Sequence, residues 1–248
     1  MNSFGRLLRI HIFGESHGEC VAVGIDGCPP GLPLVPEDFQ KDLDRRRPGA
    51  KGTTPRKEDD LPILMTGVFN GLTTGAPILI RFDNQNTRSG DYDKIRAIPR
   101  PGHADFVASR KFDGFEDYRG GGHFSGRLTV GLVAAGVIAK RILQSPHPNE
   151  NSGAAGPISV QAELIEVGGE KDTAAGLQKA IDAKDSVGGI VECRVEGLPV
   201  GLGEPFFDSA ESLIAHAAFS IPAIKGIEFG AGFQAAKMFG SEHNDALI

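Results

Sequence analysis

The sequence lacks several features that define large classes of proteins. It has no tryptophan, 2 tyrosines and 3 cysteines, and no apolar run approaches the ~18 residues that a membrane-spanning helix needs. Three cysteines cannot all form disulfides, and their spacing fits no zinc motif. Residues 1–17 do not form a secretory signal. We therefore expect a cytoplasmic protein with reduced thiols, no bound metal and no membrane association.

The sequence also lacks an excess of basic residues. It has 26 Lys and Arg against 32 Asp and Glu, which gives a formal net charge of -6 and a pI near 5.7. This balance counts against a protein that binds nucleic acid or anionic membranes along its whole surface. Glycine, in contrast, is abundant: 34 of 248 residues is nearly twice the usual share of about 7%. Glycines are favoured where the backbone turns sharply or approaches a ligand closely.

The pattern of apolar residues predicts a mixture of strands and helices. We expect strands at 7–13, 21–26, 63–69, 76–82, 158–167 and 189–195, and helices at 36–47, 106–110, 128–142, 174–181 and 210–218. The elements do not alternate regularly, so an α+β fold is favoured over a doubly wound sheet. Because the helix at 128–142 is rich in glycine and alanine, we expect it to pack closely and centrally. Residues 145–157 are expected to form a flexible connection.

The first candidate functional segment is Gly14-Glu15-Ser16-His17-Gly18, which follows a predicted strand. A histidine between glycines can reach a ligand, and it titrates near neutral pH. The alternative is a surface histidine in a tight turn. The pentapeptide alone does not choose between these interpretations.

The second candidate segment is basic. Residues 45–57 contain six cations, among them Arg45, Arg46, Arg47 and Lys51, within an acidic chain. Arginine suits phosphate and carboxylate groups because it can bind them with two parallel hydrogen bonds. The alternative is a solvated loop whose charge is balanced by the acidic residues 58–60.

The third candidate segment combines residues 100–105 with residues 117–127. His103 precedes a predicted helix, and a triple glycine leads to Ser125 and Arg127 at the start of the next one. This arrangement favours a phosphate or flavin site, although the glycines could equally form a hinge. No Gly-Lys-Ser/Thr follows, so the segment is not a Walker loop, and Gly201 to Glu204 do not continue as a dinucleotide fingerprint.

Together these segments resemble the chorismate synthase family. The motifs occur in order over nearly the whole chain, at 13–18, 42–49, 100–105, 201–205, 223–228 and 240–245. The resemblance implies an anti-1,4-elimination of phosphate from 5-enolpyruvylshikimate-3-phosphate to give chorismate, in the shikimate pathway, with a requirement for reduced FMN. It also implies a homotetramer whose subunit has helices between two antiparallel sheets, and NADPH as a possible reductant.

The resemblance assigns roles residue by residue. It implies catalysis by His17, which would protonate the leaving phosphate, and by His103, which would protonate reduced flavin. It further implies substrate binding by Ser16, Arg47, Lys51, Arg100 and Arg127, NADP binding by Arg46 and Lys51, and FMN binding by His123, Phe124, Ser125, Pro222 and Ala223.

The sequence departs from the family pattern in two places. Many members read Arg-Ser-Ser-Ala-Arg where this chain has His123-Phe124-Ser125-Gly126-Arg127. Family members also continue well past Ile248, so we expect a single domain, residues 1–248, that lacks the C-terminal part of the family's usual chain.

Two other functions remain open at this stage. A flavin reductase or oxidoreductase would show net oxidation of flavin during turnover. A non-enzymatic anion-binding or RNA-binding module built on residues 45–57 would show steep salt dependence.

Overall fold

The computed structural model describes residues 2–49, 51–53, 58–85, 92, 98–144 and 158–245. The chain divides into two compact units, Met1–Val200 and Gly201–Ile248. The predicted connection at 145–157 and the basic residues Arg56 and Lys57 lie outside the described residues.

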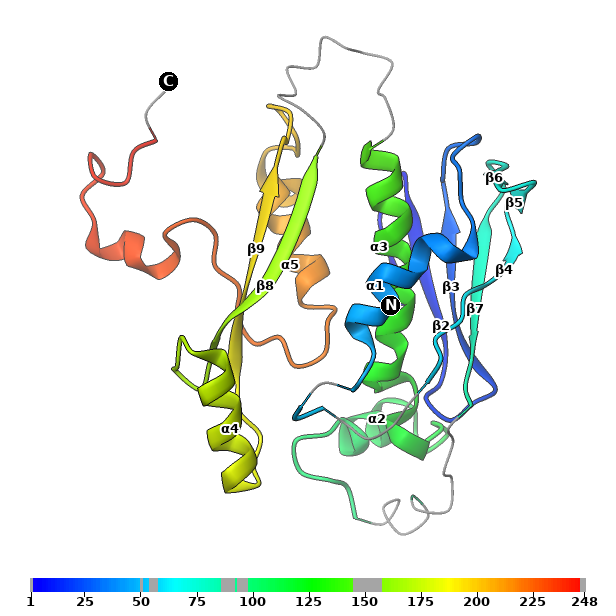
Figure 1. Ribbon diagram of the computed structural model, residues 1–248, viewed down its shortest axis with the longest axis horizontal. Helices are drawn as coiled ribbons and strands as arrows, with labels where there is room; N and C mark the ends of the chain where they lie inside the picture. The colour runs from blue at the N-terminus through cyan, green and yellow to red at the C-terminus, as the bar shows by residue number, and fades with distance from the viewer. Residues whose placement is uncertain are drawn as a thin grey trace. The chain divides into compact units, whose positions relative to one another are not determined.

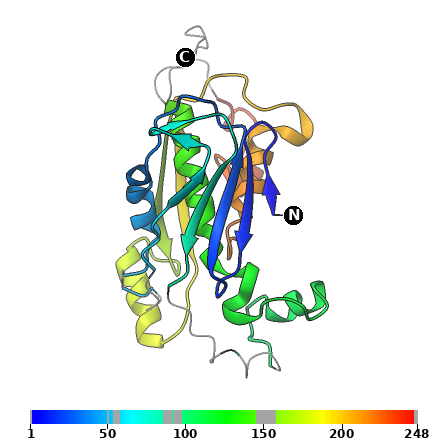
Figure 2. The same cartoon turned by 90° about the vertical axis from the view of Figure 1, so that its right-hand side faces the viewer.

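The first unit is built on a five-stranded antiparallel sheet with the strand order β1-β2-β3-β7-β4 (Figures 1 and 2). The strands are β1 (Ser3–Phe4), β2 (Arg9–Gly14), β3 (Cys20–Asp26), β4 (Ile63–Thr66) and β7 (Ile78–Asp83), and a small hairpin of β5 (Val68–Phe69) and β6 (Leu72–Thr73) adjoins β4 in the chain. Alternate residues of a strand face the same side of a sheet. The buried pairs Val21–Phe82, Val23–Ile80 and Ile25–Ile78 therefore form one apolar face.

Helix α3 (Thr129–Gln144) covers this apolar face (Figure 2). A Cβ atom placed on Gly131 would lie 3.0 Å from Ile12 and 3.3 Å from Val23, so glycine permits the close approach of helix and sheet. Helix η1 (Pro36–Phe39) and helix α1 (Gln40–Arg46) pack beside α3, and Phe39 and Leu43 are fully buried. The predicted central position of α3 is confirmed. Gly136 of the same helix has open space around it and plays no part in the close packing.

Between β7 and α3 the described residues form three short helices, and a further antiparallel pair of strands follows α3. The short helices are α2 (Asp105–Lys111), η4 (Arg119–Phe124) and η5 (Gly126–Leu128). Strands β8 (Ser159–Val167) and β9 (Gly189–Glu196) pair along their whole length, with α4 (Thr173–Ala183) between them in the chain. A hydrogen bond of 3.0 Å from the Arg45 guanidinium to the Ala162 carbonyl joins the end of α1 to β8.

The second unit contains η6 (Phe206–Asp208), α5 (Ala210–Ala218) and η7 (Gly232–Lys237). Ser209 caps α5 by accepting a hydrogen bond from the Ser212 backbone. The predicted α+β class is confirmed. One predicted strand, 63–69, is instead two strands, because Gly67 has a φ of +78° and turns the chain out of the sheet.

Candidate active site

The candidate site lies where three strand ends of the first sheet meet. Strand β2 ends at Gly14, β3 begins at Cys20, and the register pairs Cys20 with Asp83 at the end of β7. Antiparallel pairing therefore brings the His17 loop and the segment after Asp83 to the same edge of the sheet. Helix η5, which carries Arg127, also contacts β2 and β3.

His17 lies in a buried turn, not on the surface. Ser16 is 0% exposed and His17 is 7% exposed, and the Ser16 hydroxyl lies 3.3 Å from Nδ1 of His17. The Ser16 backbone N–H donates to the Gly122 carbonyl at 3.1 Å, and the Gly18 N–H closes the turn on the Glu15 carbonyl at 3.2 Å. The interpretation of His17 as a solvent-facing turn residue is therefore wrong.

The triple glycine packs directly against this turn. Gly120, Gly121 and Gly122 all have left-handed φ values, of 60°, 83° and 53°, which residues other than glycine rarely adopt. A Cβ atom on Gly120 would lie 2.2 Å from the His17 ring. These glycines thus make room for the histidine, a relation that the sequence alone did not reveal.

Tyr92 and Arg100 connect His17 to the turn that carries His103. The Tyr92 ring stands edge-on to the His17 ring at 4.9 Å, and the Arg100 guanidinium lies 5.7 Å from the centre of the same tyrosine ring. The His103 N–H donates to the Arg100 carbonyl at 3.3 Å, so the exposed His103 belongs to this turn. The two predicted catalytic histidines therefore lie on turns joined by Arg100 and Tyr92.

Two arginine–aspartate forks hold the loops around the site. Arg100 binds Asp105 through Nε and a terminal nitrogen, both at 2.8 Å, and this bond raises the pKa of Arg100 and lowers that of Asp105. Arg119 binds Asp117 in the same way at 2.8 and 2.7 Å. That bond lowers the pKa of Asp117, to which the charge of His17 adds a smaller effect. Both aspartates are thus held ionised at neutral pH.

Two predicted anion-binding arginines share one buried carboxylate. Asp60 has a fully buried side chain and binds Arg46 at 2.5 Å and Arg127 through its other oxygen. The Arg127 guanidinium, 3% exposed, also donates to the Asn84 side chain and to the Asp83 carbonyl. Within the acidic run 58–60, Asp60 therefore neutralises part of the basic stretch from a buried position, and Glu58 and Asp60 do not lie in a solvated loop.

The other predicted cations are dispersed. Arg47 binds the Asp44 carboxylate at 2.7 Å and the Asp59 carbonyl, and Lys51 binds the Gln178 side chain on α4. The structure thus joins Arg46 to Arg127 and Arg100 to the His17 region. It gives Arg47 and Lys51 other protein partners.

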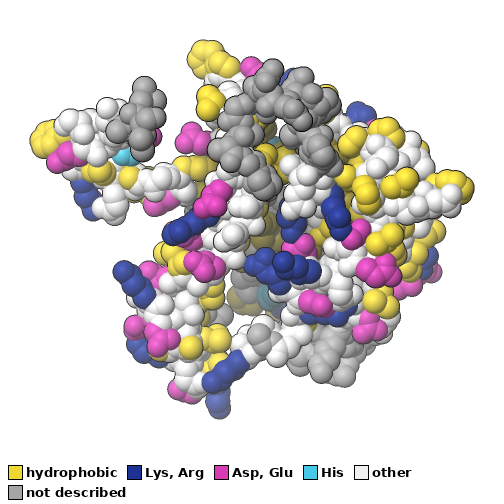
Figure 3. Space-filling model, turned by 45° about the horizontal axis from the view of Figure 1, so that its top comes forward, with side chains coloured by type: hydrophobic (Ala, Val, Ile, Leu, Met, Phe, Trp, Pro, Cys, Tyr) yellow, Lys and Arg dark blue, Asp and Glu magenta, His cyan; other side chains and the backbone are white. Residues whose placement is uncertain are grey.

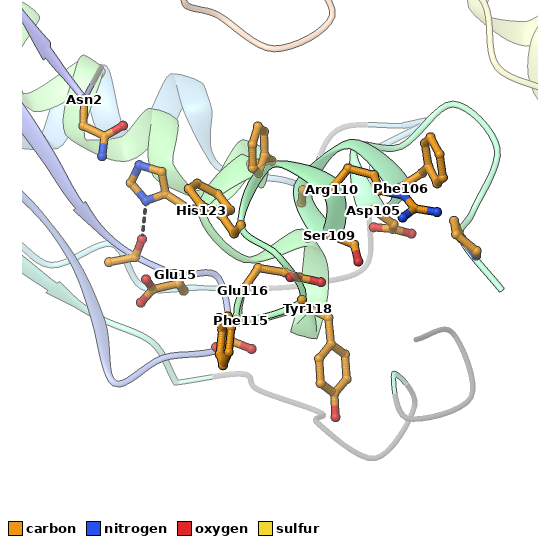
Figure 4. A pocket seen from close by; sticks show the side chains of 18 of the residues that line it. Asn2, Glu15, Asp105, Phe106, Ser109, Arg110, Phe115, Glu116, Tyr118 and His123 are labelled. Carbon is orange, nitrogen blue, oxygen red and sulfur yellow. Dashed lines mark hydrogen bonds between the residues drawn. The ribbon is translucent and has the colours of Figure 1, made fainter. Parts of the chain in front are cut away.

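A cavity of about 940 Å³ opens beside the His17 loop (Figure 4). Its lining includes the predicted flavin residues His123 and Phe124, with Phe112 and Phe115 supplying further aromatic surface. Nδ1 of His123 donates to the Gly14 carbonyl at 2.7 Å, since a carbonyl oxygen can only accept, and this fixes the ring against β2. Neither of the two predicted catalytic histidines is among the described residues that line this cavity.

The remaining predicted flavin residues have other surroundings. Ser125 caps η5, because its hydroxyl accepts from the Arg127 N–H at 3.3 Å. Pro222 and Ala223 belong to the second unit, where Ala223 has an unusual φ of 72°. Their predicted role toward FMN stays a prediction.

Sequence reasoning missed Asp60, Asn84 and Tyr92 as members of the site. In the sequence Asp60 was only one member of an acidic run. Buried arginines need a negatively charged partner, but the sequence does not show which residue supplies it. The Asp83-Asn84 pair directly after a strand carried a usable signal, since polar side chains at strand ends often reach functional loops. Tyr92 carried no signal of its own.

Two classes of feature are absent from the described part of the chain. No cluster of three or more His, Cys, Asp or Glu side chains there could hold a metal ion. None of the helices among these residues has the length and apolar character that a membrane crossing requires.

Comparison with known proteins finds matches over nearly the whole chain. The family model for chorismate synthase matches residues 8–248. A chorismate synthase from Chitinophaga pinensis is 69% identical, covering 100% of this chain and 71% of that relative, and one from Korarchaeum cryptofilum is 46% identical, covering 98% and 73%. A solved structure titled as the crystal structure of chorismate synthase superposes with a TM-score of 0.73 at 26% identity, over 97% of this chain and 73% of that one.

These matches extend over both units and all the site segments described above. The chain belongs to the chorismate synthase family.

Proposed function

We propose that the loops around His17 are where this chain carries out the chorismate synthase reaction, the elimination of phosphate from 5-enolpyruvylshikimate-3-phosphate. The observation that carries the proposal is the contact of the buried His17 with Gly120 and Tyr92, next to Arg100. An imidazole and a guanidinium thus lie against the same tyrosine ring, and together they would supply the proton and the positive charge that favour departure of phosphate.

The leaving phosphate would be stabilised by charge and by protonation. His17 would donate a proton to the departing oxygen, with the adjacent Ser16 hydroxyl as a further hydrogen-bond donor. Arg100 and Arg127 would supply the positive charge, while Asp105 and Asp60 hold their guanidinium groups in place. Because Ser16 and His17 are almost fully buried, water competes weakly for these bonds.

We assign the flavin to the aromatic cavity, because its lining supplies flat apolar surface for a ring system. Phe112 and Phe124 give it apolar faces, with ring centres 6.0 Å apart. His123, labelled in Figure 4, also lines the cavity and is held by its hydrogen bond to the Gly14 carbonyl. Phe112, Phe124 and His123 would hold reduced FMN there, and the chemistry it would supply is transient electron density for the breaking C–O bond. His103, on the neighbouring turn, would hold a proton for that group.

We extend the proposal to the features that the resemblance predicts and the fold does not address. These are NADPH as a reductant at Arg46 and Lys51, assembly as a homotetramer, and a cytoplasmic location. Size-exclusion chromatography with static light scattering would measure the molar mass and therefore the number of subunits. A monomer at micromolar concentration would contradict the tetramer.

An anaerobic assay with photoreduced FMN tests substrate, cofactor and reaction together. We expect chorismate and inorganic phosphate in equal amounts, with no net change in the flavin spectrum. Net flavin oxidation in proportion to product would instead support a flavin oxidoreductase. The anion-binding module is disfavoured because Asp44 pairs with Arg47 and Asp60 pairs with Arg46, which neutralises part of the basic stretch. On the face drawn in Figure 3, Lys and Arg side chains also alternate with Asp and Glu side chains.

His17→Ala is the sharpest variant for this assay. Loss of a positioned acid should lower the rate of chorismate formation by ~10²–10⁴-fold, with FMN binding retained. His11→Ala is the matched control, because His11 is exposed on β2, outside the site. A His17→Ala protein with wild-type turnover would remove His17 from the mechanism.

A further inference from the structure

Asn84 occupies a junction that the predicted catalytic roles do not explain. It follows β7 directly, and its backbone N–H donates to the Glu19 carbonyl at 3.0 Å, which extends the pairing of β7 beside β3. The residue is therefore fixed by the sheet itself. Its side chain extends from this fixed point into the site.

The Asn84 amide uses both of its ends. Its oxygen accepts from Nε of Arg127 at 2.9 Å, and its nitrogen donates to the Glu15 carbonyl at 3.0 Å and to the Gly18 carbonyl at 2.9 Å. Because a guanidinium can only donate and a carbonyl oxygen can only accept, the amide fits in one orientation only. Neither a carboxylate nor an apolar side chain of this size supplies both functions.

The two carbonyls that Asn84 binds bracket Ser16 and His17. The Gly18 N–H returns to the Glu15 carbonyl, so Asn84 closes the base of the turn whose tip carries the predicted acid. The same amide contacts Arg127, which Asp60 holds by a buried ion pair. One side chain therefore connects the predicted acid and a predicted phosphate-binding cation.

We propose that Asn84 is a positioning residue for the elimination: it sets the His17 turn and the Arg127 guanidinium in one fixed geometry. The inference rests on the proposed function, because it assigns the acid to His17 and an anion contact to Arg127. Asn84 itself does not touch the reacting atoms. It acts through the two groups that it joins.

Asn84→Asp is the direct test, because it conserves shape and changes only hydrogen bonding and charge. Its second oxygen would face the Glu15 and Gly18 carbonyls, replacing two attractive contacts with two repulsive ones. Since misplacement by about 1 Å can cost on the order of 10²-fold, we expect kcat to fall about 100-fold. KM should change less than kcat, because ground-state binding uses the other cations as well.

Gln85→Glu is the matched control. It makes the same amide-to-acid change one residue away, on an exposed side chain, and the hydrogen bond that Gln85 donates to Glu58 comes from its backbone N–H. We expect wild-type kcat and KM for this variant. An equal loss of kcat in both variants would overturn the proposal, because added negative charge alone would then explain it.

Amide hydrogen exchange provides a measurement that does not depend on turnover. The Ser16 and Gly18 amides are hydrogen-bonded in the turn, so Asn84→Asp should make both exchange faster, with no change in Gln85→Glu. Unchanged exchange at both amides would show that Asn84 does not hold the turn. If wild-type protein forms no chorismate, the proposed function fails, and this measurement alone decides the role of Asn84.

Asn84→Ser keeps the proposal falsifiable if the aspartate variant does not fold. Serine is neutral and too short to span Arg127 and the two carbonyls, so the turn should loosen without a buried charge. We again expect a fall in kcat that exceeds the change in KM. Wild-type kcat in a folded Asn84→Ser protein would overturn the positioning role.

Discussion

The five-stranded sheet and the β8–β9 sheet of the first unit are built from similar residues but differ in burial. In the first sheet the facing pairs Val23–Ile80 and Ile25–Ile78 are at most 1% exposed. In the β8–β9 sheet, Val160 faces Val195 and Leu164 faces Val191, and these four side chains are 38–59% exposed. The same alternation of residues thus yields a closed core in one sheet and an open apolar face in the other.

This difference explains where a precise site can be built. The His17 turn follows β2, Asn84 follows β7, and Arg127 precedes α3. These three elements belong to the five-stranded sheet and its covering helix, which we call the buried half of the first unit. Close packing there fixes the strand ends, so the loops start from well-defined positions. Helix α4, which lies between β8 and β9 in the chain, contributes Gln178, the partner of Lys51. The β8–β9 sheet makes none of the contacts to His17 described above.

Ile80→Ala and Val191→Ala should separate the two sheets most clearly. Ile80 is fully buried, so truncation removes apolar contacts and leaves a cavity, and we expect the free energy of unfolding to fall by about 2–5 kcal/mol. Val191 is exposed, and its truncation should change the free energy by about 0.5 kcal/mol or less. Urea unfolding followed by circular dichroism measures both values. Equal losses would show that the β8–β9 face is covered in the assembled protein.

Gly120→Ala tests how tightly the buried half constrains the site. The left-handed φ of 60° costs a side chain about 1–2 kcal/mol, and the new methyl group would displace the His17 ring. We expect kcat/KM to fall on the order of 10²-fold in the anaerobic chorismate assay.

Gly126→Ala is the control for this substitution. Nothing lies within 4 Å of a Cβ atom at Gly126, and its φ lies outside the left-handed range, so stability and activity should stay near wild type. Wild-type kinetics in Gly120→Ala would mean that the turn has room to adapt and that the glycine run is only a hinge.

The sequence predicted the elements of both sheets better than the contacts between loops. Periodicity located β3, β7 and α3 to within a few residues, because one apolar face dictates each of them. It missed the break between β4 and β5 at Gly67. The left-handed backbone of that glycine interrupts the strand, whereas the apolar residues on either side still read as one continuous strand in the sequence. Local pattern decides an element, whereas a turn within it depends on a single residue.

The site shows the same division. His17, Arg100 and Arg127 were identified by motif, and the structure places them around shared partners. The pairing of Asp60 with Arg127, 67 residues apart, follows from the tertiary fold and the need to neutralise a buried charge. No local pattern contains that information.

Asp105→Asn should have a smaller effect than Ile80→Ala or Gly120→Ala, and its effect should depend on pH. Arg100 holds the pKa of Asp105 below its ordinary value of 3.8, so the stabilisation is complete above that pH and is lost as the pH falls through the lowered pKa. Because Arg100 is 28% exposed and Asp105 is 14% exposed, we expect only about 0.5–1 kcal/mol. Thermal unfolding from pH 6 to pH 3 should show wild type more stable near pH 6, with the two curves converging at the acid end. Glu163→Gln on β8, opposite Glu192, relieves a like-charge pair and should not lower Tm near pH 6. A constant difference in Tm between wild type and Asp105→Asn at every pH would show that the carboxylate stabilises the protein through packing. The charge of the Arg100–Asp105 pair would then contribute nothing to the stability of the His103 turn.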